Sequence, residues 1–360
     1  MYAPTPRLEI FVDRIAENAQ ALIGQCADHG IKVAAVTKVL NAHPALLRAL
    51  MQAGVTMIAD SRIDNLKRVT ESGFAGPRLL LRSPTPRSAA QAVQWADCSL
   101  NSSSSTVTAL SRAAEAAGVE HQVVMMVDVG DLREGVWPDR AVEEAVAMSR
   151  LPHVQLVGVG TNLACYGGVL PSVTNMTKLL EVRDQCCEAT GLPLEVVSGG
   201  NSANLELMAS GDMPAGINQL RLGESIILGR NTLDREAWVG TRQDTVRVVG
   251  EVIEVARKPS VPLGETGQDA FGNHPEFVDR GVRTRAICNL GRQDVVPEAI
   301  TPTDPGIIVL GASSDHLILD VTDAASPVRL GDEIGFWPQY SALLAASTST
   351  HVRTVAVNGS

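Results

Sequence analysis

The stretch IKVAAVTK, residues 31–38, contains the unbroken apolar run VAAV and ends in a threonine and a lysine. Continuous rather than alternating hydrophobicity is typical of a strand buried on both faces of a parallel sheet. Seven further runs of this kind follow, and alanine-rich segments with helical spacing separate them. These runs are GVTMIAD (54–60), PRLLLR (77–82), ADCSL (96–100), HQVVMMVDV (121–129), VQLVGVG (154–160), LPLEVVS (192–198) and INQLRLG (217–223). Eight strand–helix units predict a closed (β/α)8 TIM-like barrel.

The pattern changes near residue 240. Segments rich in β-branched residues, such as TVRVVGEVIEVA and GIIVLGASSDHLILDVT, alternate there with turn sequences, and helical spacing is scarce. This pattern predicts a second domain that is all β. We therefore expect an α/β chain with an N-terminal strand in 1–12 that joins the β-domain, a barrel in 13–235 and a C-terminal β-domain in 236–360.

Composition limits the classes of function. The chain has 360 residues, of which 45% are hydrophobic, and its 30 Lys and Arg against 40 Asp and Glu give a net charge of −10. This acidic balance argues against a nucleic-acid partner. The six cysteines form no C-x-x-C pair, so neither a metal site nor a disulfide framework is expected. No signal peptide or membrane-length apolar run is evident, and we expect a cytoplasmic protein without a membrane partner.

The lysine that ends the first run has two interpretations. Lys38 could extend its ammonium into solvent from the end of a strand. Alternatively, it could be an amine nucleophile in a partly desolvated pocket, where it forms a covalent link to a carbonyl. The catalytic groups of a barrel gather at the C-terminal ends of its strands, and Lys38 lies at such an end.

Two late segments favour the second interpretation. SGGNSANLE (198–206) follows a strand and opens a helix, so its glycines, Ser202 and the first helical N–H groups could hold a phosphate. A plain capped turn would have the same composition. RLGESIILG (221–229) follows the last strand, where barrels often complete a phosphate site, and Arg221 precedes it. A lysine beside a phosphate cradle is what pyridoxal 5′-phosphate requires.

The chain resembles the alanine racemase-like fold, the pyridoxal-phosphate enzymes built from a barrel and a β-domain, and within it the ornithine racemase-like branch. The matching pieces run in order through essentially the whole chain. They are VTKV around Lys38, IADSRIDNL (58–66), VDVGDLREG (127–135), GVGTNLACYG (158–167), SGGNSANLE, INQLRLGESIILGR (217–230), GETGQDAFG (264–272), GRQDV (291–295) and GASSDHLILDVTD (311–323).

The resemblance implies roles at matching positions. Lys38 would carry the cofactor covalently and act as one proton-transfer base. Ser202 and Asn201, with the N–H groups of Gly223 and Glu224, would bind the phosphate. Arg221 would face the pyridine nitrogen; it cannot protonate the ring, so the ring stays a weak electron sink, which favours simple return of the proton. The substrate would contact Arg133, Asn162, Tyr166 and Ser314.

The sequence departs from alanine racemase at the second base. The catalytic tyrosine of a G-Y-x-D-G turn is Arg292 here, and the histidine that supports it is Asn162. An early phosphate-binding tyrosine falls on Ala42. Racemisation needs proton transfer on both faces of Cα, so another group must replace the tyrosine.

Asp315 and His316 are the expected replacements, because their β-domain segment should reach the neighbouring active site. Asp315 could instead bind a cationic side chain, and His316 could be an ordinary packed or surface histidine. Cys165 is more typical of a small apolar filler, and Tyr166 of a loop residue that covers the cofactor. The distal ammonium of an ornithine-like substrate should meet a carboxylate, for which Asp131, Glu134, Glu224 and Asp315 are candidates.

The expected function is therefore a pyridoxal-phosphate-dependent racemase that acts on ornithine or another basic amino acid. It would work as a homodimer in which each β-domain completes the partner's barrel site. One alternative is a metal-assisted aldolase or dehydratase of D-hydroxy amino acids, which would need metal ligands in the β-domain. The other is a non-catalytic pyridoxal-phosphate-binding protein, although the single-barrel relatives of that kind have no β-domain.

Overall fold

The computed structural model describes residues 4–357, which divide into two compact units. One unit is Val12–Gln243, and the other joins the chain up to Phe11 with the residues from Asp244 onward. Residues 236–243, which composition placed in the second domain, cluster with the first unit. Trp238 Nε1 donates to Gln25 Oε1 at 2.8 Å, and the Arg242 N–H donates to Asn18 Oδ1 at 2.7 Å.

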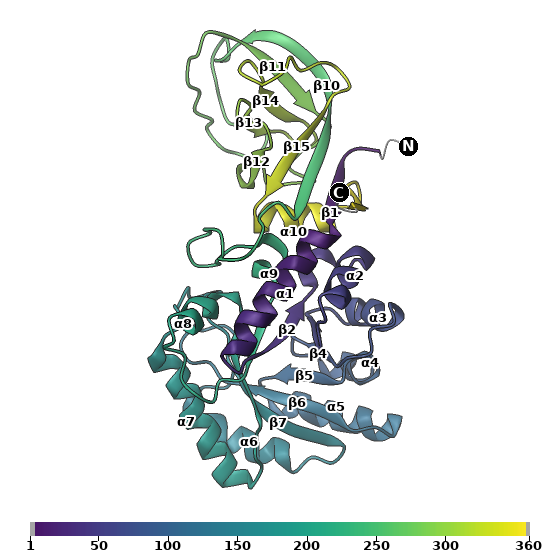
Figure 1. Ribbon diagram of the computed structural model, residues 1–360, viewed down its shortest axis with the longest axis vertical. Helices are drawn as coiled ribbons and strands as arrows, with labels where there is room; N and C mark the ends of the chain where they lie inside the picture. Colours follow the sequence, from purple (N-terminus) through teal and green to yellow (C-terminus); the bar gives the residue numbers. More distant parts are fainter. Residues whose placement is uncertain (1–3, 358–360) are drawn as a thin grey trace. The chain divides into compact units, whose positions relative to one another are not determined.

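The first unit is the predicted barrel. Its strands pair in parallel, close on themselves through β2 and β9, and lie inside a layer of helices (Figure 1). The strands are β2 (Lys32–Val36), β3 (Ile58–Asp60), β4 (Arg78–Leu80), β5 (Cys98–Asn101), β6 (His121–Met126), β7 (Val154–Gly160), β8 (Val196–Gly200) and β9 (Gln219–Leu222). The helices are α1 (Val12–Asp28), α2 (Pro44–Gln52), α3 (Ile63–Glu71), α4 (Ala89–Trp95), α5 (Ser104–Ala117), α6 (Ala141–Ser149), α7 (Val173–Thr190), α8 (Leu205–Ala209) and α9 (Glu224–Leu228).

Two apolar layers hold the barrel together, and they follow the alternation of side chains along each strand. Val124 and Met126 of β6 belong to one buried cluster with Ala34 of β2 and Leu100 of β5. Val123 and Met125, which alternate with them, belong to a second cluster that includes helix residues such as Leu110. Both faces of the strands are thus buried, which is why the strand sequences are continuously apolar.

The second unit is built on a β-sheet, as predicted, and this sheet is mainly antiparallel; it also contains one helix that the sequence did not suggest. Its strands run in the order β12-β15-β10-β11-β14-β13, and β1 pairs with β10 and, in parallel, with β16. The elements are β1 (Arg7–Phe11), β10 (Val246–Pro259), β11 (Val282–Cys288), β12 (Ile300–Pro302), β13 (Ile308–Ala312), β14 (Leu317–Asp320), β15 (Glu333–Pro338), α10 (Tyr340–Thr348) and β16 (Arg353–Val357).

Charged side chains fix β1 within this sheet. Arg7 donates two hydrogen bonds to the carboxylate of Glu333 on β15, at 2.7 and 2.6 Å. Glu9 accepts from Arg7 at 2.8 Å and from Arg247 on β10 at 2.7 Å. Bidentate, charge-assisted pairs of this kind are directional, so they set the position of β1 as well as holding it.

Candidate active site

Lys38 stands at the C-terminal end of β2 on a fixed backbone. It begins a 3-10 turn, Lys38–Leu40, and its own side chain is exposed. The residue before it, Thr37, is fully buried and donates to Asp60 Oδ2 at 2.6 Å. Asp60 also accepts from the Arg62 N–H at 2.8 Å, and burial raises the pKa of its carboxyl group. Hydrogen bonds of the adjacent Thr37 therefore fix the backbone from which the flexible Lys38 side chain extends.

A cluster of hydroxyl and N–H groups forms where β8 and β9 end. Ser202 Oγ lies 2.9 Å from Ser225 Oγ and accepts long hydrogen bonds of 3.4 Å from the N–H groups of Gly223 and Ser225. A Cβ on Gly223 would lie 3.0 Å from Val36 Cβ, so the end of β2 packs closely against this backbone. Ser225 is a member that the sequence did not single out, although a second hydroxyl so close to Gly223 was a usable signal.

Glu224 and Lys38 belong to the same neighbourhood. The Glu224 carboxylate pairs with Arg235 at 2.5 Å. Burial raises the pKa of Glu224, while the positive charges of Arg235, Lys38 and Arg230 act in the opposite direction. The side chain of Glu224 is thus committed to Arg235, which leaves its N–H group as the part of Glu224 that could bind a phosphate.

Arg221 lies in the barrel with neutral partners. It is 4% exposed, donates to Ser198 Oγ at 2.5 Å and to the Thr161 carbonyl oxygen at 2.7 Å, and reaches Asn162 Oδ1 at 3.3 Å. Burial lowers the pKa of Arg221 to about 10, so the guanidinium stays charged at neutral pH. A buried cation with only neutral acceptors is a site for an additional acceptor, such as a ring nitrogen.

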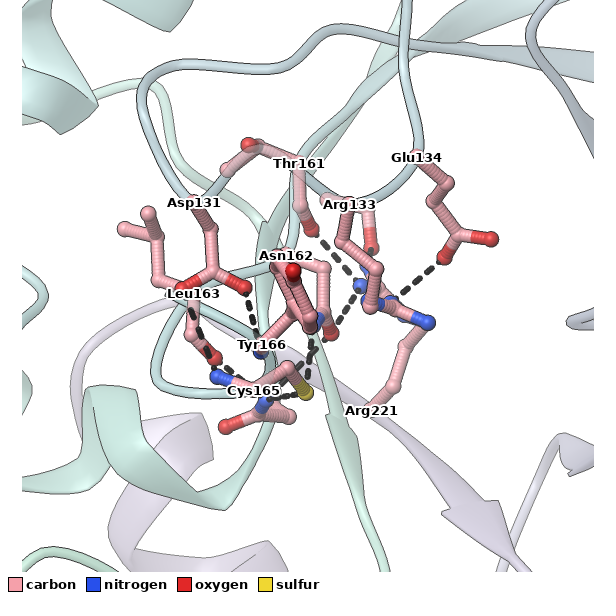
Figure 2. A network of polar contacts seen from close by, with 11 residues as sticks. Asp131, Arg133, Glu134, Thr161, Asn162, Leu163, Cys165, Tyr166 and Arg221 are labelled. Carbon is pink, nitrogen blue, oxygen red and sulfur yellow. Dashed lines mark hydrogen bonds and ion pairs between the residues drawn. The ribbon is translucent and has the colours of Figure 1, made fainter. Parts of the chain in front are cut away.

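Asn162 links Arg221 to the loop after β7 (Figure 2). Its Oδ1 accepts from Arg221 and from Asn201 Nδ2, each at 3.3 Å, and its Nδ2 donates to Cys165 Sγ at 2.8 Å. Asn201 also donates to the Leu163 carbonyl oxygen at 2.9 Å and caps the turn that begins with Ser202. The predicted residues Asn162, Asn201 and Arg221 are thus brought together, and Cys165 joins them.

Asp131 holds that loop in place. Its carboxylate is 1% exposed and accepts three backbone hydrogen bonds, from Cys165 at 3.4 Å and Val169 at 3.2 Å on Oδ1 and from Tyr166 at 3.0 Å on Oδ2. The Asp131 carbonyl oxygen also accepts from the Gly167 N–H at 3.1 Å. This carboxylate is therefore a structural clamp, and it does not present a free oxygen to a substrate ammonium.

Two other predicted contacts are more open to solvent. Arg133 is exposed and pairs with Glu134 at 2.6 Å. The carboxylate of Glu134, a candidate to bind a substrate ammonium, is therefore already paired. Tyr166 is held through its backbone, and its residue as a whole is 78% exposed. Both lie on the loops that Asp131 joins, so they border the network in Figure 2.

The remaining predicted residues belong to the second unit. Asp315 and His316 share an exposed hydrogen bond, with Oδ1 and Nδ1 2.7 Å apart, and this bond lowers the pKa of Asp315. The turn that carries Arg292 packs against them, because its N–H groups donate to the carbonyl oxygens of Ser313 and the exposed Ser314. Arg292 itself pairs with Glu298 at 2.6 Å.

Two features are absent from residues 4–357. No helix in this range is both long and apolar enough to cross a membrane. Within the same range, no group of three or more His, Cys, Asp or Glu side chains is arranged to hold a metal ion.

Comparison with known proteins gives a consistent result. The family model for the alanine racemase N-terminal domain matches residues 10–230. The lysine racemase of Thermotoga maritima is 41% identical over 350 residues, which are 97% of this chain and 98% of that protein. The ornithine racemase of Acetoanaerobium sticklandii is 38% identical over 348 residues, or 96% and 98% of the two chains. Alanine racemase from Streptomyces lavendulae has a similar fold, with a TM-score of 0.77 and 20% identity over 100% of this chain and 99% of the other.

Proposed function

Because the chain belongs to the alanine racemase N-terminal domain family, we propose that it is a pyridoxal-phosphate-dependent racemase of basic amino acids. Its relatives named lysine racemase and ornithine racemase align with nearly the whole chain, which supports both the reaction and the substrate class. The observation that carries the proposal is the surroundings of the end of β9. There, Arg221 has only neutral partners, Gly223 donates to Ser202, and Glu224 lies in the electrostatic field of Lys38.

These residues fit the cofactor. Ser202, Asn201 and the N–H groups of Gly223 and Glu224 would hold its phosphate. The N–H groups of Gly223 and Ser225 make only long bonds to Ser202, which leaves them free to turn toward a phosphate. Lys38 would hold its aldehyde carbon. The bound cofactor would supply a sink for the electron pair left when a Cα–H bond breaks.

The protein would then limit the chemistry to proton transfer. Arg221 would donate a hydrogen bond to the ring nitrogen without giving up its proton, so the ring would remain neutral. Lys38 would remove or return a proton at the substrate Cα. Arg133 and Asn162 would face the carboxylate side of the substrate, with Tyr166 above them.

We also propose a homodimer in which the second unit of one subunit completes the site of the other. Large apolar side chains are exposed on that unit, namely Leu263, Phe271, Phe277 and Val278, and such a group is typical of a contact surface. In this arrangement Ser314, Asp315 and His316 would approach the substrate. Asp315 would meet its distal ammonium, since Asp131, Glu134 and Glu224 are already committed to other groups. The unpaired cysteines suit a reducing compartment, so we place the enzyme in the cytoplasm.

The test uses the full chain incubated with pyridoxal phosphate. We expect a visible absorbance band that Lys38→Ala abolishes and that Lys178→Ala, which removes an exposed lysine paired with Glu181, leaves intact. L-ornithine or L-lysine in D₂O should lose optical rotation and gain deuterium at Cα, whereas L-alanine should react poorly. A chain that takes up no cofactor, or whose band survives Lys38→Ala, would show that the proposal is wrong.

A further inference from the structure

Racemisation needs a proton-transfer group on each face of Cα, because one group seldom reaches both. The barrel offers Lys38 for one face. We infer that Cys165 is the second proton-transfer residue, acting on the face opposite Lys38. This inference rests on the proposed racemase function and adds to it the residue that replaces the missing tyrosine.

The barrel topology separates the two residues. Lys38 follows β2 and Cys165 follows β7. Two strands, β8 and β9, lie between β2 and β7 on one side of the closed barrel, and four strands lie between them on the other. The two side chains therefore enter the mouth of the barrel from different directions, as a reaction on two faces requires.

The thiol is also oriented by the site. The amide oxygen of Asn162 faces two donors, Arg221 and Asn201, so its Nδ2 must face the sulfur of Cys165. Sulfur acts as the acceptor in that contact, so its own S–H bond points elsewhere. Figure 2 shows Asn162 between the guanidinium and the thiol, which ties Cys165 to the group proposed to mark the position of the cofactor ring.

Hydrogen bonds fix the backbone of Cys165 and of the residue before it. Its N–H donates to the buried carboxylate of Asp131. The preceding residue, Ala164, has a φ of 50°, a left-handed conformation that is costly for a residue with a side chain, and its N–H donates to the Val169 carbonyl oxygen. Strain of this kind persists at functional sites, where the position of one side chain matters more than the stability of its loop.

Cys165 also differs from the other thiols of the barrel. Cys26, Cys98 and Cys186 are buried, and Cys187 is half-buried with its thiol donating to the Pro193 carbonyl oxygen at 3.5 Å. Among the cysteines of the first unit, only Cys165 is exposed and contacts the Arg221 network.

The proton balance is simple. In one direction the Lys38 amine takes the Cα proton, the electron pair of the broken bond stays with the substrate, and the S–H bond of Cys165 breaks as a new Cα–H bond forms. In the other direction the thiolate takes the proton and the Lys38 ammonium returns one. Exchange with water restores the starting protonation of both groups, so no oxidant or metal is needed.

The decisive experiment follows deuterium in each enantiomer. Cys165→Ala and Cys165→Ser, loaded with pyridoxal phosphate, are given L- or D-ornithine in D₂O. We expect racemisation to fall at least about 100-fold. One enantiomer should still exchange its Cα proton with retention, through Lys38, while the other should not. Serine keeps an acceptor for Asn162 but is a much weaker acid, so it separates proton transfer from positioning. Cys187→Ala is the matched control and should behave like the wild type.

A second readout does not depend on turnover. Iodoacetamide should label Cys165 in the free protein, as judged by peptide mass spectrometry, and pyridoxal phosphate with ornithine should protect it, while the labelling of Cys187 stays unchanged. Unprotected labelling of Cys165 would overturn the inference.

Other outcomes are equally clear. Racemisation by Cys165→Ala close to the wild-type rate, or equal loss of exchange for both enantiomers, would overturn the role of Cys165 while leaving the racemase function intact. One-sided exchange in Asp315→Asn or His316→Gln, with Cys165→Ala fully active, would return the role to the second unit. A wild-type protein without cofactor band or exchange would instead refute the proposed function itself.

Discussion

Asp131→Asn should loosen the loop that carries Cys165, and the structure allows the cost to be worked out. The carboxylate uses both oxygens: Oδ1 accepts from the N–H groups of Cys165 and Val169, and Oδ2 accepts from that of Tyr166. An asparagine can replace only one of these oxygens. Its NH₂ group must then face at least one backbone N–H, which loses its acceptor. Water cannot replace that acceptor, because residue 131 is only 1% exposed.

Losing one charge-assisted hydrogen bond in a buried place costs roughly 1.5–3 kcal/mol, and the bonds that survive now reach a neutral acceptor. Removing the buried charge offsets part of this loss. We therefore expect the loop to lose about 2–4 kcal/mol of stability against local opening. At the lower end, the amide hydrogens of Cys165, Tyr166 and Val169 would exchange with D₂O roughly 30-fold faster.

Hydrogen exchange measured by mass spectrometry, together with urea unfolding followed by circular dichroism, would test this expectation. Asp128→Asn is the matched control. Asp128 is also buried, but both of its backbone donors, Gly130 at 2.9 Å and Leu132 at 3.2 Å, meet the same oxygen, Oδ1. Asparagine can keep both bonds there, so the change should stay below about 1 kcal/mol. Equal effects of the two variants, or unchanged exchange at Tyr166 in Asp131→Asn, would refute the reasoning.

Three further predictions concern the cofactor cradle, the second unit and pH. Ser202→Ala should weaken pyridoxal phosphate binding roughly tenfold, because the shared hydroxyl of the cradle is lost; titration of the apoprotein measures this, and an unchanged affinity would contradict it. Gly291→Ala should lower the free energy of unfolding by more than about 2 kcal/mol, since its Cβ would meet the Ser314 carbonyl oxygen at 2.1 Å, whereas Gly267→Ala, with nothing within 4 Å, should not. Burial lowers the pKa of His121 from 6.5 to about 4, so below pH 6.5 the unfolded chain binds a proton that the folded chain refuses. Stability should therefore fall by roughly 3 kcal/mol as the pH drops from about 6.5 to about 4, and His121→Gln should show a shallower slope in the same unfolding assay.

The barrel was predictable because its signal is local. Most of the buried strands are short apolar runs, and the run at 154–160 coincides with β7. The first run is longer than its strand, since β2 ends at Val36 and Thr37 turns its hydroxyl to Asp60. Periodicity reveals neither this tertiary hydrogen bond nor the 3-10 turn that begins at Lys38.

The hydrogen bonds that join the residues of the site could not be predicted from local sequence patterns. Arg221 finds its partners at Ser198 and Thr161, which other strands supply. In the sequence, Asp131 is as good a candidate to bind an ammonium group as the other carboxylates. Only the structure shows that its carboxylate accepts backbone hydrogen bonds from the loop after β7. The proximity of Cys165 to Asn162 depends on a left-handed residue, Ala164, that composition does not mark. Residue types were therefore predictable, whereas the pairing of one loop with another was not.

The place of β1 in the second unit has a consequence for how the chain is assembled. Ile10 of β1 lies opposite Val246 of β10 in an antiparallel pair, and the Phe11 N–H donates to the Thr245 carbonyl oxygen at 2.9 Å. Topologically, β1 and β10 are a β-hairpin whose turn is the entire barrel. The barrel is continuous in sequence and can fold as soon as it has been synthesised, but β1, which is made first, must wait for β10 and finally for β16. A fragment that starts at Asp244 would expose the edges that β1 covers. A short turn from Phe11 to Asp244 would instead yield the second unit as an uninterrupted sheet.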